Sequence, residues 1–542
     1  MANFKTCIVL LIFSFFKILS ASAQESSKVR VSNFIIKKGN QGPMVYDDSR
    51  IIGLVSIQGG KNILQINDEK IGEFSFVKYD ENCQMIQGGS FLLPDVDVNK
   101  NFTRIKSISV NGEFVYMYYE SHDKKQNSFS YLQKFSSQIE PVGKRILLSV
   151  EETGNGFMTD RFGYPLSSYN IFYSNDKTKI CIAKSGNTGK VKNKMFSDKY
   201  TVHDFTTGIT ENYYNNFFVD KGFQKDLNIS VGDDGNVYIF YKISNSEEED
   251  KGFRYAFKSI GKNVDSSELK IPFNDIWLKN SIIRVEGKTL IISATYKKRN
   301  NKFKPIYAPK YIEGIVLSKF DLVSRTEIQN NRLLFINIFK DYKIFNFDKD
   351  ELNQYSYGFE NANFSSNGSI DFVLVGSKYV LQDGAKFGYN NSFQSEEEVE
   401  KRGYLPIILR FSPKFELLHH SVLNISPCGE NNYSTTGEFL MLPNGNEFSL
   451  VTLSDTTNSD FLNTKKMICW GSDKKIKLTT FKFTGSGEVL RTFDAPFEIR
   501  KKMYIDLKKP VCLAKESGTF YFFSKNWKGY AKDYVLTSYK VQ

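Results

Sequence analysis

Short apolar runs separated by polar turns recur along the whole chain, and long amphipathic helical patterns are almost absent. The runs are rich in Phe, Tyr, Val and Ile and are bounded by Gly, Asn and Asp, which is typical of β-strands joined by tight turns. Alternation within a run such as "VYIFYK" (237–242) is weak and mostly apolar, as expected of a strand covered on both faces. The pattern predicts an all-β protein with buried sheets.

One unit of this pattern repeats: a turn, a strong strand, a loop, a second strand, a polar turn and a third strand. The spacing between copies ranges from about 52 to about 81 residues, which is too irregular for a strict solenoid and suits four-stranded blades of roughly 40–50 residues with inserted loops. The eight copies are centred on the turn residues Gly60, Gly112, Asp176, Gly235, Gly287, Gly368, Gly445 and Gly518.

This organisation resembles the β-propeller fold from about Lys28 to Gln542. The resemblance is architectural, because the chain has neither a WD dipeptide nor a kelch signature. It implies eight blades, with seven blades and one irregular insertion as the alternative. We label the strands of a blade A to D: the glycine turn joins A to B, and the second polar turn joins C to D. The copy around Gly235 predicts strands at 227–231, 236–242, 253–258 and 267–271.

We expect the first and the last strand-like runs of the chain to belong to the same blade. The eighth copy reaches Gln542 directly after its C strand and would leave an exposed sheet edge. The run "KVRVSNFIIKK" (28–38) is extra to the first copy. We therefore expect it to pair with the last blade and close the ring.

The first 23 residues have the features of an export signal. Lys5 supplies a positive charge, "CIVLLIFSFF" (7–16) an apolar core and "ASA" (21–23) a small-residue cleavage site. No later transmembrane segment is visible in the sequence. We expect residues 24–542 to form a single propeller domain in the periplasm, in the medium or on the surface of a Gram-negative bacterium.

Charge and cysteine usage narrow the class of protein. The formal net charge of +12 is compatible with acidic glycans, lipopolysaccharide or nucleic acid as partners. The abundance of Lys, Asn, Ile and Phe favours another explanation, which is that the charge reflects a bias in overall composition. We expect no nucleic-acid partner. An odd number of cysteines follows the signal, so one or two disulfides could form, with pairing left open, and a disulfide scaffold is excluded. They are Cys83, Cys181, Cys428, Cys469 and Cys512.

Motifs that would fix a reaction are missing from the sequence. It has no H-E-x-x-H, G-x-S-x-G, P-loop or strand-linked G-x-G-x-x-G motif, and only four histidines. We predict no metal site and no cofactor. Asp233 and Asp234 precede Gly235 in one of the repeated turns, so they are interpreted as turn residues rather than as metal ligands or an acid/base pair.

Loop length points to one face of the propeller as the binding face. The A–B and C–D turns are tight, whereas the B–C loops include long insertions at 297–311, 379–404 and 455–475. Loops on a rigid scaffold commonly carry function, and aromatic rings with cationic side chains suit glycans and peptides. The alternative is that the tryptophans pack loops onto the blades. The candidate ligand-binding residues are Trp277, Arg299, Tyr307, Tyr311, Trp470 and Trp527.

Two functions remain open at this point. The first is a monomeric, exported binding or scaffold module that recognises a protein or glycan at the cell envelope. The second is a propeller hydrolase or lyase acting on glycans, with carboxylates in the mouth of the channel. Candidates for these carboxylates are Asp160, Asp275 and Asp348, in D–A loops.

Overall fold

The computed structural model describes most of the chain and organises it as antiparallel sheets. It describes residues 29–36, 51–70, 73–93, 102–122, 127–152, 169–184, 191–244, 253–262, 264–299, 312–340, 355–382, 397–423, 440–444, 447–455, 476–484, 489–493, 503–506, 512–514, 519–528 and 531–540. These residues form seven sheets and one short helix, α2 (Phe335–Phe339). The predicted signal peptide lies outside them.

Five of the sheets have four strands each, in chain order. They are β2 (Ile51–Ile57), β3 (Asn62–Lys70), β4 (Glu73–Asp80) and β5 (Met85–Leu92); β6 (Phe102–Asn111), β7 (Phe114–His122), β8 (Asn127–Phe135) and β9 (Ile146–Glu152); β17 (Ile276–Glu286), β18 (Thr289–Lys298), β19 (Gly314–Asp321) and β20 (Thr326–Leu334); β21 (Tyr355–Phe364), β22 (Ile370–Gln382), β23 (Glu397–Phe411) and β24 (Leu417–Val422); and β25 (Leu440–Asn444), β26 (Glu447–Asp455), β27 (Ile476–Phe483) and β28 (Val489–Phe493).

A sixth sheet has seven strands because one long strand, β13 (Thr210–Val231), pairs with a different neighbour along each part of its length. Residues 210–222 of β13 pair with β12, and residues 223–231 pair with β14. The sequence predicted an A strand only at 227–231, whereas β13 is 22 residues long. The strands are β10 (Tyr169–Tyr173), β11 (Lys179–Lys184), β12 (Val191–Asp204), β13 (Thr210–Val231), β14 (Val237–Ser244), β15 (Phe253–Ile260) and β16 (Leu269–Ile271).

The remaining sheet joins the two ends of the described chain. β1 pairs with β32 in antiparallel fashion, as the run at 28–38 predicts, with Val29 opposite Tyr539. Its strands are β1 (Val29–Ile36), β29 (Met503–Asp506), β30 (Cys512–Ala514), β31 (Thr519–Lys528) and β32 (Ala531–Lys540).

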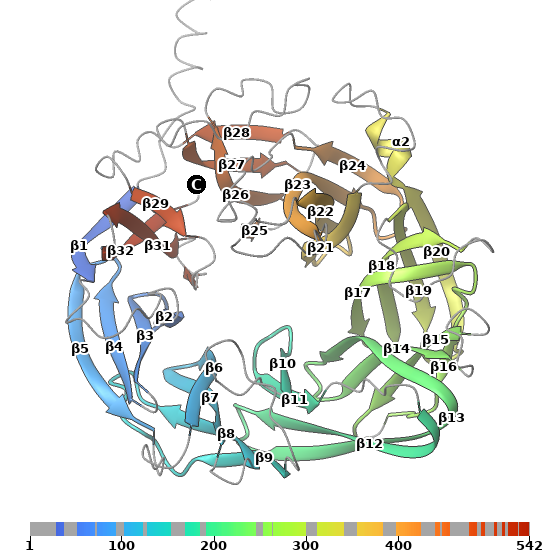
Figure 1. Cartoon of the computed structure of the whole chain (residues 1–542), viewed down its shortest axis with the longest axis horizontal. Helices are drawn as coiled ribbons and strands as arrows, with labels where there is room; N and C mark the ends of the chain where they lie inside the picture. The colour runs from blue at the N-terminus through green and yellow to red at the C-terminus, as the bar shows by residue number, and fades with distance from the viewer. Residues whose placement is uncertain are drawn as a thin grey trace, which may run out of the picture.

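The sheets follow one another around a ring, with strands such as β2, β6 and β17 innermost and β5, β9 and β20 outermost (Figure 1). Repeated four-stranded antiparallel sheets in this arrangement make the chain an all-β, propeller-like repeat protein. Buried apolar side chains fill the spaces between neighbouring sheets. One such cluster joins Phe240 and Tyr255 of one sheet to Leu290 of the next. Complete burial of a side chain of this kind contributes about 1.5–3 kcal/mol.

The turns between strands lie together at one end of the sheets, which we call the turn face. Left-handed backbone at Gly60, Gly235 and Gly368 closes three of these turns, as the repeat predicts. In the third copy this position belongs to Lys177, with a φ of 58°, and not to the predicted Asp176. The amides of Lys177 and Gly235 donate equivalent 3.0 Å hydrogen bonds, to Ser174 O and Gly232 O.

Asp233 and Asp234 act in one of these turns, as predicted. Asp234 accepts hydrogen bonds from the Asn236 amide at 3.0 Å and the Tyr238 hydroxyl at 2.9 Å. Asp233 accepts one from the Asp176 amide of the preceding turn at 3.1 Å. One carboxylate therefore shapes its own turn, and the other connects two adjacent turns.

Other hydrogen bonds between neighbouring sheets also lie at this face. Gln58 Nε2 donates to Ser137 Oγ at 3.2 Å, and Tyr521 OH donates to Glu81 O at 3.3 Å. A buried ion pair within the β21–β24 sheet, in which Arg410 Nε donates to Asp371 Oδ1 at 2.6 Å, adds another link, because Arg410 Nη1 donates to Thr484 O of the next sheet at 3.1 Å. The turn face is thus a hydrogen-bonded scaffold.

Candidate functional site

The innermost strands of five sheet units each carry a β-bulge. A bulge leaves an extra residue out of the ladder and re-aims its side chain, and bulges are frequent beside active sites. The register shifts between Ile51 and Gly53, Ile105 and Ser107, Asp226 and Asn228, Leu278 and Ser281, and Phe359 and Asn361.

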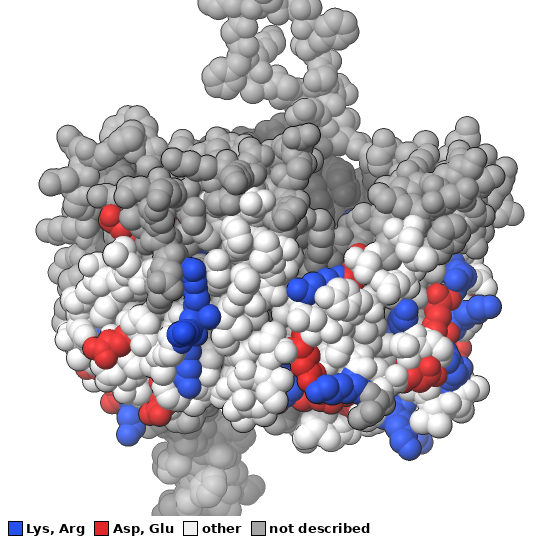
Figure 2. Space-filling view, turned by 90° about the horizontal axis from the view of Figure 1, so that it is seen from below, with Lys and Arg blue, Asp and Glu red and all other residues white. Residues whose placement is uncertain are grey.

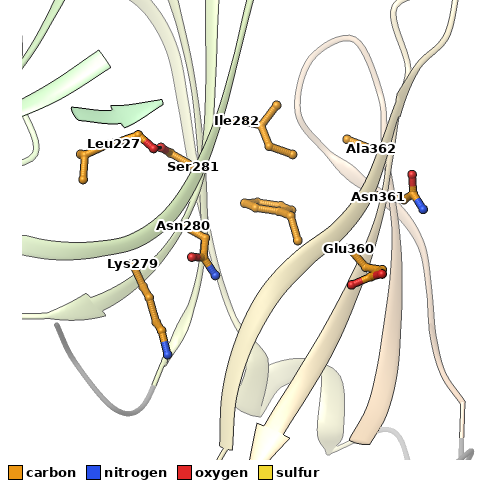
Figure 3. Close-up of a pocket in the computed structure, with 9 residues that line it drawn as sticks. Leu227, Lys279, Asn280, Ser281, Ile282, Glu360, Asn361 and Ala362 are labelled. Atoms are coloured by element: carbon orange, nitrogen blue, oxygen red, sulfur yellow. Dashed lines mark hydrogen bonds between the residues drawn. The ribbon is translucent and has the colours of Figure 1, made fainter. Parts of the chain in front are cut away.

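Three of these bulges lie side by side and form a pocket of about 350 Å³. Leu227 of β13, residues 279–282 of β17 and residues 359–362 of β21 line it. Figure 3 shows Lys279, Asn280 and Glu360 toward one end of the pocket and Ile282 and Ala362 toward the other. The charged side chains therefore lie toward one end, which we call the polar end, whereas Asn361 lies beside Ala362 toward the other.

Hydrogen bonds between the inner strands hold this wall in place. Asn228 Nδ2 donates to Ser281 O at 2.8 Å, and Ser281 Oγ donates to Leu227 O at 3.4 Å. On the other side, a Cβ at Gly358 would lie 2.6 Å from Asn280 Nδ2, so only glycine leaves room for this amide as it stands. The bulge of β17 is fixed by both of its neighbours.

The polar end can both donate and accept hydrogen bonds. A lysine ammonium only donates, an ionised carboxylate only accepts, and an asparagine amide does both. Lys279, Glu360 and Asn280 supply these three groups from two strands. Such a set suits a ligand rich in hydroxyl groups, which also donate and accept. Among the described lining residues, Glu360 carries the only carboxylate.

A second group of side chains gathers where β14, β15, β17 and β18 meet, at the end of the sheets opposite the turn face. The rings of Phe253 and Trp277 stack with centroids 4.3 Å apart. Lys242 Nζ lies 4.6 Å and 4.4 Å from the Phe253 and Trp277 centroids, and Arg299 Cζ lies 4.8 Å and 5.7 Å from them. We call these four residues the cation cluster.

The backbone beside this cluster orders Arg299. Its amide donates to Asp275 O at 2.8 Å, and its Nη1 reaches Asn274 O at 3.4 Å. The Asp275 carboxylate receives Arg332 Nη2 at 3.0 Å, and the hydrogen bond and charge of Arg332 lower the pKa of Asp275 below its ordinary value. Asp275, a predicted catalytic candidate, is therefore an ionised partner of Arg332.

A buried polar group lies behind another bulge, that of β6. Lys106 Nζ is 3.6 Å from Glu120 Oε2, and the Tyr118 hydroxyl donates to Glu120 Oε1 at 2.9 Å. Burial, and then the charge of Glu120, raise the pKa of Tyr118. Here the bulge residue pairs with a carboxylate inside the sheet, whereas the bulges of β17 and β21 line a pocket.

The structure brings together two of the six predicted ligand-binding residues, Trp277 and Arg299. Trp277 lies within β17, not before the strand as predicted, and is only 7% exposed. This burial favours packing over stacking on a ligand. Trp527, predicted in a loop, lies in β31 opposite Lys532. Tyr307, Tyr311 and Trp470, like Asp160 and Asp348, lie outside the described residues.

Sequence reasoning did not identify Lys242, Lys279, Asn280 or Glu360. The signal that could have suggested the last three is an interruption of strand alternation, such as "WLKNSII" (277–283). A bulge of this kind depends on the partner strand, which the local sequence does not specify.

The described part of the chain offers little other site chemistry. It contains no group of three or more His, Cys, Asp or Glu side chains that could hold a metal ion. Within the same residues, no helix is long and apolar enough to cross a membrane. The thiols of Cys83, Cys181 and Cys512 are buried, and burial raises the pKa of Cys512 to about 12. Figure 2 shows acidic and basic side chains interspersed over the described surface of one side.

Comparisons with known proteins find similarity in shape but not in sequence. No protein-family model matches the chain, and no curated protein matches it. A polysaccharide lyase structure is 9% identical with a TM-score of 0.40, and the match covers 96% of this chain and 98% of the lyase. The propeller domain of the trilobed protease from Pyrococcus furiosus is 10% identical with a TM-score of 0.32, over 80% and 97% of the two chains.

The WD40 domain of SCAP from fission yeast is also similar, at 10% identity and a TM-score of 0.30, over 94% of this chain and 98% of that domain. At such identities and TM-scores these similarities identify neither a family nor a function. The fold assignment rests on the repeated four-stranded sheets.

Proposed function

We propose that this protein is an exported binding module of the cell envelope and that a glycan occupies the pocket between β13, β17 and β21. The observation that carries the proposal is the polar end of this pocket, where Lys279, Asn280 and Glu360 combine donors and acceptors. A volume of about 350 Å³ is also in the usual range for small-ligand sites. The export signal and the choice of glycan over protein belong to the proposal.

We further infer eight blades closed by the N-terminal strand. The seven-stranded sheet divides into two four-stranded units that share β13, which supports eight units in place of seven sheets. The pairing of β1 with β32 supports closure of the ring. A closed ring would hold the three bulged strands at fixed separations, as a preformed pocket requires.

Calorimetry on the mature chain tests the binding proposal. A glycan array first selects the ligand, and Asn280→Ala and Glu360→Gln are then compared with wild type. Each change removes one or two hydrogen-bonding groups, so we expect binding about tenfold weaker. Asn175→Ala, in an exposed turn of the turn face and away from the pocket strands, is the matched control and should bind like wild type. Unchanged affinity in both pocket variants would contradict the proposal.

The alternative is a glycan hydrolase or lyase in the same place. Most glycoside hydrolases use two carboxylates, whereas the described lining residues supply Glu360 alone. We therefore place binding first. Incubation of the wild-type chain with the selected glycan separates the two: new reducing ends or unsaturated sugars that disappear in Glu360→Gln would favour the enzyme.

A further inference from the structure

We propose that the cation cluster is a subsite for an anionic group and that the ligand of the neighbouring pocket is an acidic glycan. The inference rests on the proposed function of the pocket and adds the chemical class of its ligand. The anionic group is a carboxylate or a sulfate, both of which offer several acceptor oxygens to a guanidinium.

The two cations of the cluster share one aromatic pair. Lys242 Nζ and Arg299 Cζ each lie within 6 Å of both the Phe253 and Trp277 ring centroids, so one aromatic pair holds two positive charges near one another. The two rings are 4% and 7% exposed, whereas both cationic side chains are half-buried. Charges beside an apolar, water-poor surface attract an anion more strongly than charges in bulk water.

Further charged side chains lie around the cluster. Lys297 and Lys298 lie opposite Trp277 and Ile276 in the β17–β18 ladder and add two more cations. Two carboxylates also lie here. Asp275 pairs with Arg332, and Glu313 Oε2 accepts a hydrogen bond from the Lys298 amide at 3.2 Å. Both of these carboxylates thus have a partner other than Lys242 and Arg299.

The cluster and the pocket share the strand β17. Trp277 and Lys279 are two residues apart on β17, which corresponds to about 7 Å along a strand. Lys279 lies at the polar end of the pocket (Figure 3). A sugar chain whose hydroxyl groups fill that end can therefore place an acidic substituent at the cluster without leaving β17.

The role assigned to Trp277 differs from the predicted one. Stacked on Phe253 and nearly buried, it positions Lys242 and Arg299 rather than stacking on a sugar. Cation–π contacts of this kind restrict the long side chains of Lys242 and Arg299. The anion would contact the cations, not the rings.

The experiment compares three polysaccharides with the full mature chain: polygalacturonate for carboxylates, dextran sulfate for sulfates, and dextran as the neutral chain. We expect one of the acidic polymers to bind at least tenfold more tightly than dextran, and its binding to weaken as salt rises. In the double variant Lys242→Gln/Arg299→Gln, acidic binding should fall roughly tenfold while any dextran binding is unchanged.

Two further variants make the result specific. Lys242→Arg keeps the charge and should retain acidic binding. Lys288→Gln removes an exposed lysine from the turn at the other end of the same β17–β18 hairpin and should have no effect. A thermal melt confirms that each variant is folded.

The outcomes separate this inference from the proposed function. If Asn280→Ala weakens glycan binding while the double variant does not, the pocket is supported and the anionic subsite is overturned. If none of the wild-type interactions depends on Asn280 or Glu360, the proposed function itself fails. Equal affinity for single-stranded DNA and for the acidic glycan would also overturn the inference, because charge alone would then explain binding.

Discussion

The turn face and the inner wall at β17 and β21 are built from the same repeat but use it differently. At the turn face, carboxylates and amides satisfy one another within and between neighbouring turns, as Asp233 and Asp234 do. At the inner wall, bulges take Lys279, Asn280 and Glu360 out of the regular ladder and place them around a pocket. The regular parts of the repeat thus supply the scaffold, and its interruptions supply the candidate site.

The largest effect on stability is expected from Asp371→Ala, which removes a buried carboxylate at the turn-face end of β22. Asp371 is fully buried and pairs with Arg410, which is only 6% exposed, so the change leaves a buried guanidinium without its carboxylate. We expect the free energy of unfolding to fall by about 3–5 kcal/mol, measured by urea titration. Asp265→Ala, which breaks the solvent-exposed pair with Arg325, should change the free energy of unfolding far less, because solvent screens that pair. Similar losses in the two variants would contradict the prediction.

A smaller effect is expected from the backbone of the equivalent turns. Gly235 has a φ of 84°, and a Cβ there would meet only Lys179 atoms at 3.6 Å, so Gly235→Ala is limited by conformation rather than space. It should destabilise the chain by about 1–2 kcal/mol. Lys177→Gly, at the equivalent turn position with a φ of 58°, should stabilise it or leave it unchanged. Urea titration measures both, and glycan binding should not change in either.

A substitution beside the pocket should instead weaken ligand binding while leaving stability nearly unchanged. In Gly358→Ala the new Cβ displaces the Asn280 amide, which is the end of a flexible side chain. We expect stability to change by less than about 0.5 kcal/mol, while ligand binding weakens roughly fivefold. Calorimetry and a thermal melt on the same preparation check this. Loss of stability with intact binding would remove the distinction between scaffold and site.

The smallest effect concerns pH at the turn face. His203 is 1% exposed and its Nδ1 lies 2.8 Å from Thr210 Oγ1; burial lowers the pKa of His203 below its ordinary value. The unfolded chain therefore binds this proton more readily, so stability is present above about pH 6.5 and is lost as pH falls below it. Urea titrations at about pH 7.5 and 5.5 should show a smaller fall for His203→Gln. An equal fall in both proteins would assign the pH dependence to other groups.

The sequence predicted the strands well because their determinants are local. Turn glycines followed by apolar runs located the strands of the copy around Gly235, whose C and D strands are β15 and β16. Two features were missed for physical reasons. Lys177 adopts a left-handed φ without being glycine, and the bulges that form the pocket depend on the neighbouring strand rather than on local residue type.

The candidate site was predicted only in part. Trp277 and Arg299 do lie together, but exposure of the tryptophan was inferred from its place near a loop, and packing against Phe253 in the neighbouring sheet buries it. Lys242 was missed because its contact with Trp277 crosses from one sheet to the next. Contacts between repeats are not encoded in the pattern of any single repeat.

The shared strand β13 has a consequence for how the molecule opens. A break or insertion in a surface loop leaves the strands on either side paired, whereas a break in β13 disrupts ladders with both β12 and β14. The two halves of this sheet should therefore exchange their amide hydrogens as one cooperative unit, while sheets joined by loops can open separately. Leu227 of β13 lines the pocket. A ligand in the pocket would therefore contact the sheet whose two halves are expected to open only together.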